Sequence, residues 1–450
     1  MNMDRAILED LKLWANDSAS KPLILEGARQ IGKTYILKQL GSKYFKNYHY
    51  LNFENDDDLA KLFESTLKPQ MILEKLEINF SIEINPKTDL LILDEIQVCP
   101  RALTSLKYFC EDMPELKVVA AGSLLGIKLG KASFPVGKVD FMQMQAMDFK
   151  EFILALGHSK LYQLLNKINL NKENSFSLID YTTHKHLWEL LKFYFIVGGL
   201  PEIVELFVKH HKDLSLAFQL VRDKQNDLIK SYLADIAKHS GKINSMHIES
   251  LWRNAAIQLG SSQDESANKF KFKEAIPGIK EYNRIESALD WLIKTKLLIK
   301  CPIIKQAQTP LAAYAEYNKF KLFIFDIGIL GAMSKLSPKA IMEYDYGTYK
   351  GFFAENYAAQ ELTASGISEL YSWEGKESEI EFVIDIDGSI IPIEIKSGRQ
   401  TKSKSMKAFT DKYHPKQRFI FSAKEAYINS EDGFYGLPLY LVNLLKNCSV

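Results

Sequence analysis

A glycine-rich turn between an apolar run and a helical run is the feature that most constrains the fold. Residues 23–34 read Leu-Ile-Leu-Glu-Gly-Ala-Arg-Gln-Ile-Gly-Lys-Thr, so Gly27 and Gly32 frame the turn and Lys33 and Thr34 follow it. Glycines remove the Cβ atoms where a backbone must curl around an anion and point its N–H groups inward. The spacing G-x-x-x-x-G-K-T therefore predicts a phosphate-binding loop that follows a strand and begins a helix.

The residues of this loop predict a nucleotide site. We expect Lys33 to reach the β- and γ-phosphates and the Thr34 hydroxyl to meet a magnesium ion. The same spacing also arises by chance in unrelated sequences. A chance match is rarer when a strand precedes the motif and a helix follows it. We expect that helix over residues 35–40, ended by Gly41, with its positive end toward the phosphates. The predicted ligands are ATP and Mg²⁺, and the predicted contacts are Gly27, Ala28, Arg29, Gln30, Ile31, Gly32, Lys33, Thr34 and Tyr35.

A second apolar run ends in two carboxylates. Residues 89–95 read Asp-Leu-Leu-Ile-Leu-Asp-Glu, which suits a buried parallel strand and is too short for a helix. We expect Asp94 to hold the magnesium through water and Glu95 to be the general base for the attacking water. The alternative is an acidic turn after a core strand.

A third apolar run, residues 116–123, ends at Ser123. This residue either senses the γ-phosphate or only begins a loop.

The order of the remaining segments predicts the domain organisation. Up to about residue 150, strands alternate with helices, which is typical of an α/β domain with a parallel sheet covered on both faces. Residues 151–240 read as a helical, lid-like region, interrupted by Gly198-Gly-Leu-Pro201. Residues 241–336 have the outline of a winged helix, with a strand pair and an apolar helix face that we expect to be core. That face comprises Ile285, Ala288, Leu289, Leu292 and Ile293.

Composition bounds the functional classes. At 450 residues the chain is long enough for about three domains. The 57 basic and 56 acidic residues leave a net charge of +1, so no global field recruits nucleic acid. Four cysteines without C-x-x-C spacing and nine histidines without a zinc-binding pattern indicate reduced thiols and a cytoplasmic protein. No long apolar stretch predicts a membrane span.

The C-terminal third, residues 337–450, carries a different group of residues. Glu355 lies in a helical run, and two strands, 379–384 and 390–397, are joined by a turn at 385–388. Residues two apart share a strand face, so Glu394 and Lys396 lie together and Glu381 meets them across the hairpin. Such a group can hold a divalent metal and activate a water for phosphodiester cleavage. The alternative is an ordinary exposed ion pair on a hairpin.

Several motifs along the whole chain carry a family resemblance. They are Gly27-Ala-Arg-Gln-Ile-Gly-Lys-Thr34, Leu93-Asp-Glu-Ile-Gln97, Ala121-Gly-Ser-Leu-Leu-Gly126, Ser133-Phe-Pro-Val-Gly137, Gly198-Gly-Leu-Pro-Glu202, Tyr232-Leu-Ala-Asp-Ile236, Lys321-Leu-Phe-Ile-Phe-Asp-Ile-Gly-Ile-Leu330 and Pro392-Ile-Glu-Ile-Lys-Ser397. With them the chain resembles the prokaryotic P-loop ATPases that have an AAA-like N-terminal domain and a C-terminal DUF4143 domain.

The resemblance implies ATP binding and hydrolysis, with Lys33, Thr34, Asp94 and Glu95 in the roles given above. It also implies a C-terminal PD-(D/E)xK nuclease-like fold, whose site residues are Glu355, Glu381, Glu394 and Lys396. Two residues depart from the family pattern. Glu381 stands where aspartate is usual, and Lys138 stands where arginine is frequent. Glutamate is one methylene longer than aspartate, which argues against DNA cleavage, and lysine lacks the planar fork of arginine, which argues against an arginine finger from that loop.

Three functions follow as hypotheses. The first is an ATP-hydrolysing switch coupled to a nuclease-like C-terminal domain, and the second is an ATP-regulated, metal-dependent DNA nuclease. The third is a module that holds nucleotide without turnover, against which Glu95 argues. DNA contact through the C-terminal region, a protein partner and an oligomer stay open, and no membrane contact is expected.

Overall fold

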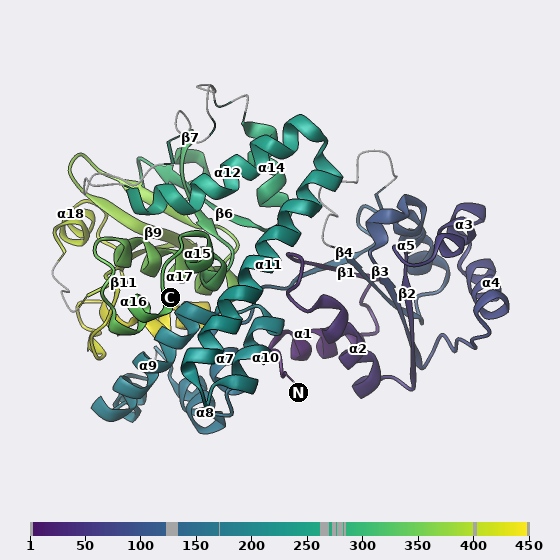
Figure 1. Cartoon of the computed structure of the whole chain (residues 1–450), viewed down its shortest axis with the longest axis horizontal. Coiled ribbons are helices and arrows are strands. Elements are labelled where there is room, and N and C mark those ends of the chain that lie inside the picture. The colour runs from purple at the N-terminus through teal and green to yellow at the C-terminus, as the bar shows by residue number, and fades with distance from the viewer. Residues whose placement is uncertain are drawn as a thin grey trace. The chain divides into compact units, whose positions relative to one another are not determined.

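The computed structural model describes residues 3–122, 134–170, 172–261, 270–271, 276, 282, 285–398 and 403–447. The chain divides into two compact units, Asn2–Gln145 and Ala146–Val450, the second of which also counts Met1. The first unit carries the purple and blue elements of Figure 1. Among the described residues, no helix combines the length and apolarity that a membrane crossing requires.

The first unit is built on a five-stranded sheet in the order β2-β3-β4-β1-β5, and every neighbouring pair is parallel. This confirms the predicted α/β fold. Its helices and strands are α1 (Ile7–Asn16), β1 (Leu23–Glu26), α2 (Lys33–Tyr44), β2 (Asn47–Asn52), α3 (Asp57–Ser65), α4 (Pro69–Phe80), β3 (Asp89–Asp94), α5 (Pro100–Asp112), β4 (Lys117–Gly122) and β5 (Asp140–Gln143).

Burial explains why this sheet forms. All six residues of β3 are buried, as expected for a central parallel strand whose two faces are both covered. Leu91 and Leu93 of β3 belong to one apolar cluster with Leu59 of α3, Ile72 of α4 and Leu106 of α5. This cluster fixes β3 in the sheet, so the carboxylates at the end of the strand are held on a rigid element.

The expected end of the first helix at Gly41 is wrong. α2 continues through Gly41 to Tyr44. A Cβ atom on Gly41 would lie 2.6 Å from the side chain of Tyr48 on β2. Gly41 is therefore a point where the helix and the following strand approach closely, and the pattern that suggested a helix end reflects tertiary packing.

The second unit combines helices with a mixed sheet in the order β12-β13-β11-β10-β9-β8-β6-β7. Its helical part comprises α7 (Phe149–Ala155), α8 (Ser159–Lys167), α9 (Tyr181–Val197), α10 (Pro201–His210), α11 (Leu214–Ser240), α12 (Lys242–Ser261) and α14 (Glu286–Lys294). The rest comprises β6 (Leu298–Ile304), β7 (Ala315–Ile324), α15 (Ile327–Met333), α16 (Pro338–Glu343), α17 (Tyr349–Ala364), β8 (Tyr371–Glu374), β9 (Glu379–Ile386), β10 (Ser389–Ile395), α18 (Lys404–Tyr413), β11 (Arg418–Ser422), β12 (Tyr427–Asn429), β13 (Phe434–Pro438) and the 3₁₀ helix η6 (Leu439–Asn447).

The strand pair expected between residues 241 and 336 forms as β6 and β7, but not as the wing of a separate module. β6 pairs in parallel with β8 through Ile303 and Ile304, so β6 and β7 are one edge of the eight-stranded sheet. The apolar face of the preceding helix is core, as expected, because Ile285, Ala288 and Leu289 are buried. The segment with the winged-helix outline is therefore not a self-contained unit, because its strand β6 pairs with β8, which comes later in the chain.

Two of the resemblance motifs meet in the core of this unit. α9 ends at Val197, and Gly198 (φ +76°) caps it. The Gly199 N–H donates to Asp326 Oδ2 over 2.6 Å. Asp326 Oδ1 also accepts from the Ile329 N–H at the start of α15. A Cβ atom on Gly198 would lie 2.3 Å from Asp326 Oδ1. Gly198 is thus required both by its backbone conformation and by the buried carboxylate beside it, and Gly199 is required because a Cβ atom there would lie 2.1 Å from the Met147 carbonyl oxygen.

Candidate nucleotide-binding site

The glycine-rich loop has the backbone conformation of an anion-binding turn. It leaves β1 at Gly27 (φ +153°), passes Gln30 (φ +66°) and enters α2 through Gly32 (φ +94°). A Cβ atom on Gly27 would lie 2.4 Å from the Met144 carbonyl oxygen, so this position requires glycine. Left-handed residues in a short loop turn successive N–H groups to one side, which forms a concave anion site at a helix N-terminus.

Lys33 is buried at the base of this loop. Its Nζ donates to the carbonyl oxygens of Gly27 (2.9 Å) and Ala28 (2.8 Å). Burial lowers the pKa of Lys33 to about 8, against the opposing charges of Glu95 and Asp94. The ammonium is therefore held by weak neutral acceptors that phosphate oxygens can replace with stronger, charge-assisted hydrogen bonds.

Asp94 brings the predicted magnesium residues together. Its Oδ2 accepts from the Thr34 hydroxyl over 2.7 Å, and Asp94 is itself buried at the end of β3. A hydroxyl and a carboxylate at one point are the hard oxygen donors that Mg²⁺ prefers. The residues present fit a magnesium ion.

Tyr50 is a site residue that the sequence analysis missed. Its hydroxyl donates to the same Asp94 Oδ2 over 2.8 Å, and burial raises the pKa of Tyr50 to about 12. Tyr50 reaches Asp94 because β2 pairs with β3, with Asn52 opposite Asp94. The Lys38 Nζ lies 3.8 Å from the centre of the Tyr50 ring. The sequence of β2 does not show that this strand lies beside β3.

Glu95 is positioned by a left-handed backbone and by a neighbouring amide. It has φ +53°, its N–H donates to Asp94 Oδ1 (3.0 Å), and its Oε2 accepts from Gln97 Nε2 (2.5 Å). Burial raises the pKa of the Glu95 carboxyl, and the Gln97 hydrogen bond opposes that rise. A carboxylate that is more basic than usual and fixed in direction suits proton abstraction from water.

The remaining predicted contacts have separate outcomes. Ala28 and Ile31 are buried. The Arg29 guanidinium lies 3.7 Å from the Glu54 carboxylate. The Tyr35 hydroxyl accepts from the Met3 N–H over 3.3 Å. Ser123 lies outside the described residues.

The C-terminal unit brings together the four residues predicted for the nuclease-like site. Lys396 Nζ lies 2.6 Å from Glu394 Oε1, and the Ile395 N–H donates to Glu381 Oε2 over 3.3 Å. Glu355 comes from α17 and contributes to the same electrostatic cluster. Glu381 lies where the pairing of β8 with β9 shifts register, and its carboxylate accepts the hydrogen bond from the N–H of Ile395 on β10.

Lys321 of β7 is the residue that the sequence analysis missed in this cluster. It is 1% exposed, lies 3.3 Å from Glu355 Oε2 and also pairs with Glu379. Burial alone would lower the pKa of Lys321, but Glu355 and Glu379 raise it above its ordinary value. Among the described residues, no group of three or more acidic, histidine or cysteine side chains is arranged to hold a metal ion. Two lysines supply the positive charge of this cluster.

Three family models match the chain in succession. Residues 19–153 match a family described as an AAA domain, residues 188–340 match the domain of unknown function DUF8612, and residues 350–442 match the domain of unknown function DUF4143. The first match spans β1 to β5 and so contains the whole glycine-rich loop. The last contains Glu355, Glu381, Glu394 and Lys396.

Individual relatives are more distant. The uncharacterized protein MJ1544 of Methanocaldococcus jannaschii is 25% identical over 396 residues, which cover 83% of this chain and 74% of that protein. The Walker-type ATPase paby2304 of Pyrococcus abyssi is 16% identical, with 74% of this chain and 96% of that chain covered and a TM-score of 0.46. The Aeropyrum pernix ORC1 protein, solved in complex with DNA, is 11% identical, with 74% and 92% covered and a TM-score of 0.31.

These TM-scores are too low to carry a functional argument, so the family matches and the geometry of the loop decide the assignment. The AAA match coincides with the parallel sheet and its phosphate-binding loop, and the DUF4143 match coincides with the C-terminal sheet. The chain thus contains an AAA-type P-loop ATPase domain in its N-terminal part and a DUF4143 domain at its C-terminal end.

Proposed function

We propose that this protein binds and hydrolyses ATP and acts as a nucleotide-dependent switch for its nuclease-like C-terminal domain. The observation that carries the proposal is the meeting of Thr34 and Asp94 at 2.7 Å beside the glycine-rich loop. We assign ATP hydrolysis to residues 1–150, a lid-like role to residues 151–240 and the nuclease-like domain to residues 337–450. ATP and Mg²⁺ are the ligands that this chemistry requires.

Each residue has a defined task in the proposed reaction. The N–H groups of the loop and the Lys33 ammonium bind the phosphates, and Thr34 and Asp94 hold the magnesium ion that neutralises developing charge on the phosphates. Glu95, directed by Gln97, accepts a proton from the attacking water. Arg29 lies within the loop, and its ion pair with Glu54 holds the guanidinium back from the γ-phosphate. We therefore expect slow turnover by the isolated protein.

A binding experiment tests the first step. The affinity for a fluorescent ATP analogue is measured with Mg²⁺ for the wild type and for Lys33→Ala. We expect binding by the wild type and its loss in Lys33→Ala, because the variant leaves the phosphates without their ammonium. Equal affinities would contradict the assignment of this loop as the nucleotide site.

A metal-dependent DNA nuclease is the second candidate, favoured by the convergence of Glu355, Glu381, Glu394 and Lys396. The ammonium of Lys321 between Glu355 and Glu379 argues against a metal in this cluster. We propose a nuclease-like fold with weak or absent cleavage. Linear, nicked and single-stranded DNA incubated with Mn²⁺ and the protein, beside Lys396→Ala, decides between the two. Strong cleavage by the wild type that the variant lacks would establish the nuclease instead.

A further inference from the structure

A pocket with a cavity volume of about 290 Å³ lies in the C-terminal unit, at the carboxyl ends of the parallel strands β10 and β11. Ser397 and Gly398 follow β10, and Ala423 follows β11. The Ala423 N–H donates to the Gly398 carbonyl oxygen over 3.2 Å, which ties the two strand ends together. In open α/β sheets, ligands commonly bind at the carboxyl ends of parallel strands.

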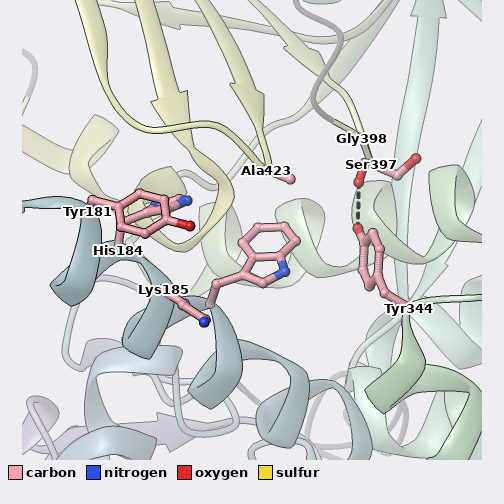
Figure 2. A pocket seen from close by; sticks show the side chains of 8 residues that line it. Tyr181, His184, Lys185, Tyr344, Ser397, Gly398 and Ala423 are labelled. Atoms are coloured by element: carbon pink, nitrogen blue, oxygen red, sulfur yellow. Dashed lines mark hydrogen bonds between the residues drawn. The ribbon is translucent and has the colours of Figure 1, made fainter.

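One face of α9 forms a second wall of this pocket. Tyr181, His184, Lys185 and Trp188 follow the i, i+3, i+4, i+7 spacing that places residues on one side of a helix. Figure 2 shows Tyr181, His184 and Lys185 on one side of the pocket and Tyr344 with Ser397 on the other. Buried His184 is anchored by Tyr440, whose hydroxyl lies 2.9 Å from its Nδ1. This hydrogen bond makes the wall rigid at His184. Tyr181 and Lys185, on the same helix face, are exposed to solvent.

Tyr344 supplies a fixed aromatic surface. Its hydroxyl donates to the Ser397 carbonyl oxygen over 2.6 Å, as the dashed line in Figure 2 marks. The Lys350 Nζ donates to the Tyr344 carbonyl oxygen (2.9 Å) and lies 5.4 Å from the centre of its ring. The Tyr344 and Trp188 rings meet edge to face, with their centres 5.5 Å apart. These contacts hold two of the pocket's rings in place, so a planar ligand need not order them.

We propose that this pocket binds a nucleobase of single-stranded nucleic acid, stacked on Trp188, with Tyr181 as a second aromatic wall and a flanking phosphate on Lys185. Aromatic rings that stack with a base, together with a cation for the backbone, are how single strands are held without sequence preference. No carboxylate pairs with Lys185 among the described residues, so its charge is available to a phosphate. A base paired in a duplex cannot enter such a pocket.

The position of the pocket agrees with this ligand. Lys396 of the acid–lysine cluster and Ser397 of the pocket are neighbours in the chain, so the cluster and the pocket share one end of β10. The inference does not depend on ATP hydrolysis by the first unit. It concerns strand binding only and requires no cleavage by the cluster.

Tryptophan fluorescence gives a direct probe. The chain has five tryptophans, of which Trp14, Trp252, Trp291 and Trp373 are buried. Trp188 is half-buried, so a base stacked on it would quench mainly this residue. A short oligo(dT) titrated into the full chain should therefore quench the emission, and a blunt duplex should not.

Variants separate stacking from a general electrostatic attraction. Fluorescence anisotropy of labelled oligo(dT) should show roughly tenfold or more weaker binding for Trp188→Leu, and nearly unchanged binding for Trp188→Phe, which keeps an aromatic ring. Tyr181→Ala should weaken binding, whereas Tyr427→Ala should not. Tyr181 and Tyr427 are matched controls because they are 63% and 66% exposed. Lys185→Ala should reduce the salt dependence, the slope of log K against log salt, by about 0.7.

Two further measurements complete the test. Circular dichroism confirms that each variant is folded, and Lys33→Ala should keep oligonucleotide binding while losing ATP, so the two proposals fail separately. Equal affinity of the wild type and folded Trp188→Leu for oligo(dT) would overturn the proposal. Equal affinity of the wild type for the duplex and the single strand would overturn it as well.

Discussion

The Thr34 hydroxyl donates a hydrogen bond to Asp94 Oδ2 over 2.7 Å, although the two residues are 60 positions apart in the chain. Thr34 stands at the start of α2 and Asp94 at the end of β3, so a glycine-rich loop and a buried strand end converge at one point. Both elements are fixed by packing of the parallel sheet. We infer that this relationship defines the position of the proposed magnesium ion before any ligand binds, and the predictions below test its consequences.

Tyr50 should tune the magnesium site. Tyr50→Phe removes the hydroxyl that donates to Asp94 Oδ2 but keeps the ring. Because partners of this kind orient a metal-binding carboxylate, we expect the Mg²⁺ concentration for half-maximal ATP hydrolysis to rise by roughly tenfold or more. Tyr48→Phe, on the same strand, is the matched control and should leave it unchanged. An identical magnesium dependence for Tyr50→Phe and wild type would show that the hydroxyl has no such role.

ATP affinity should fall at high pH because burial lowers the pKa of Lys33 to about 8. Below this pKa the free protein already carries the ammonium that phosphate requires, so the affinity is independent of this group. Above it, ATP binding must take up a proton, and the affinity should fall by up to about tenfold for each pH unit. Titrations of an ATP analogue on either side of the pKa check this. A constant affinity through the whole alkaline range would contradict it.

Two helical glycines should respond in opposite ways to alanine. Gly41→Ala places a Cβ atom 2.6 Å from the Tyr48 side chain and should lower the free energy of unfolding by roughly 1–3 kcal/mol. Gly351→Ala, in α17, meets nothing within 4 Å and should raise it by up to about 1 kcal/mol. Urea denaturation followed by circular dichroism measures both. Equal effects of the two substitutions would show that the approach of α2 to β2 is not close.

Lys321 should be essential for the stability of the C-terminal unit. Lys321→Met leaves Glu355 and Glu379 without their buried cation, and we expect a loss of about 3–5 kcal/mol in the free energy of unfolding. Adding Glu355→Gln should recover part of the loss, because it removes one of the unpaired charges. Thermal denaturation of the two single variants and the double variant tests this coupling. Strictly additive losses would mean that Lys321 and Glu355 do not interact.

The contrast between predicted and missed residues has a physical basis. The glycine-rich loop and β3 could be predicted because their signals are local: glycine spacing, a buried apolar run and carboxylates at its end. Tyr50 and Lys321 were missed because their partners come from other parts of the chain: Tyr50 meets Asp94 because β2 lies beside β3, and Lys321 of β7 meets Glu355 of α17 and Glu379 of β9. A strand's own sequence does not specify its neighbour.

The same limit explains the two errors of fold. Gly41 was read as a helix end from sequence, yet it is glycine because Tyr48 packs against it. The strands β6 and β7 were read as a local wing, yet β6 pairs with β8, which begins at Tyr371. In both cases the local sequence pattern reflects a contact with a residue or strand that comes later in the chain. Gly198 and Gly199, by contrast, were correctly read as a break between helices, because Pro201 at the start of α10 and the positive φ of Gly198 are local signals.

The central claim is that Glu95 activates water for ATP hydrolysis at this site. The most direct test is the rate of phosphate release with saturating ATP and Mg²⁺ for the wild type and for Glu95→Gln, with nucleotide affinity measured on the same samples. We predict unchanged ATP binding and a rate that falls roughly a hundredfold or more, because the amide cannot accept the proton of the attacking water. Equal rates for the wild type and Glu95→Gln would contradict this account.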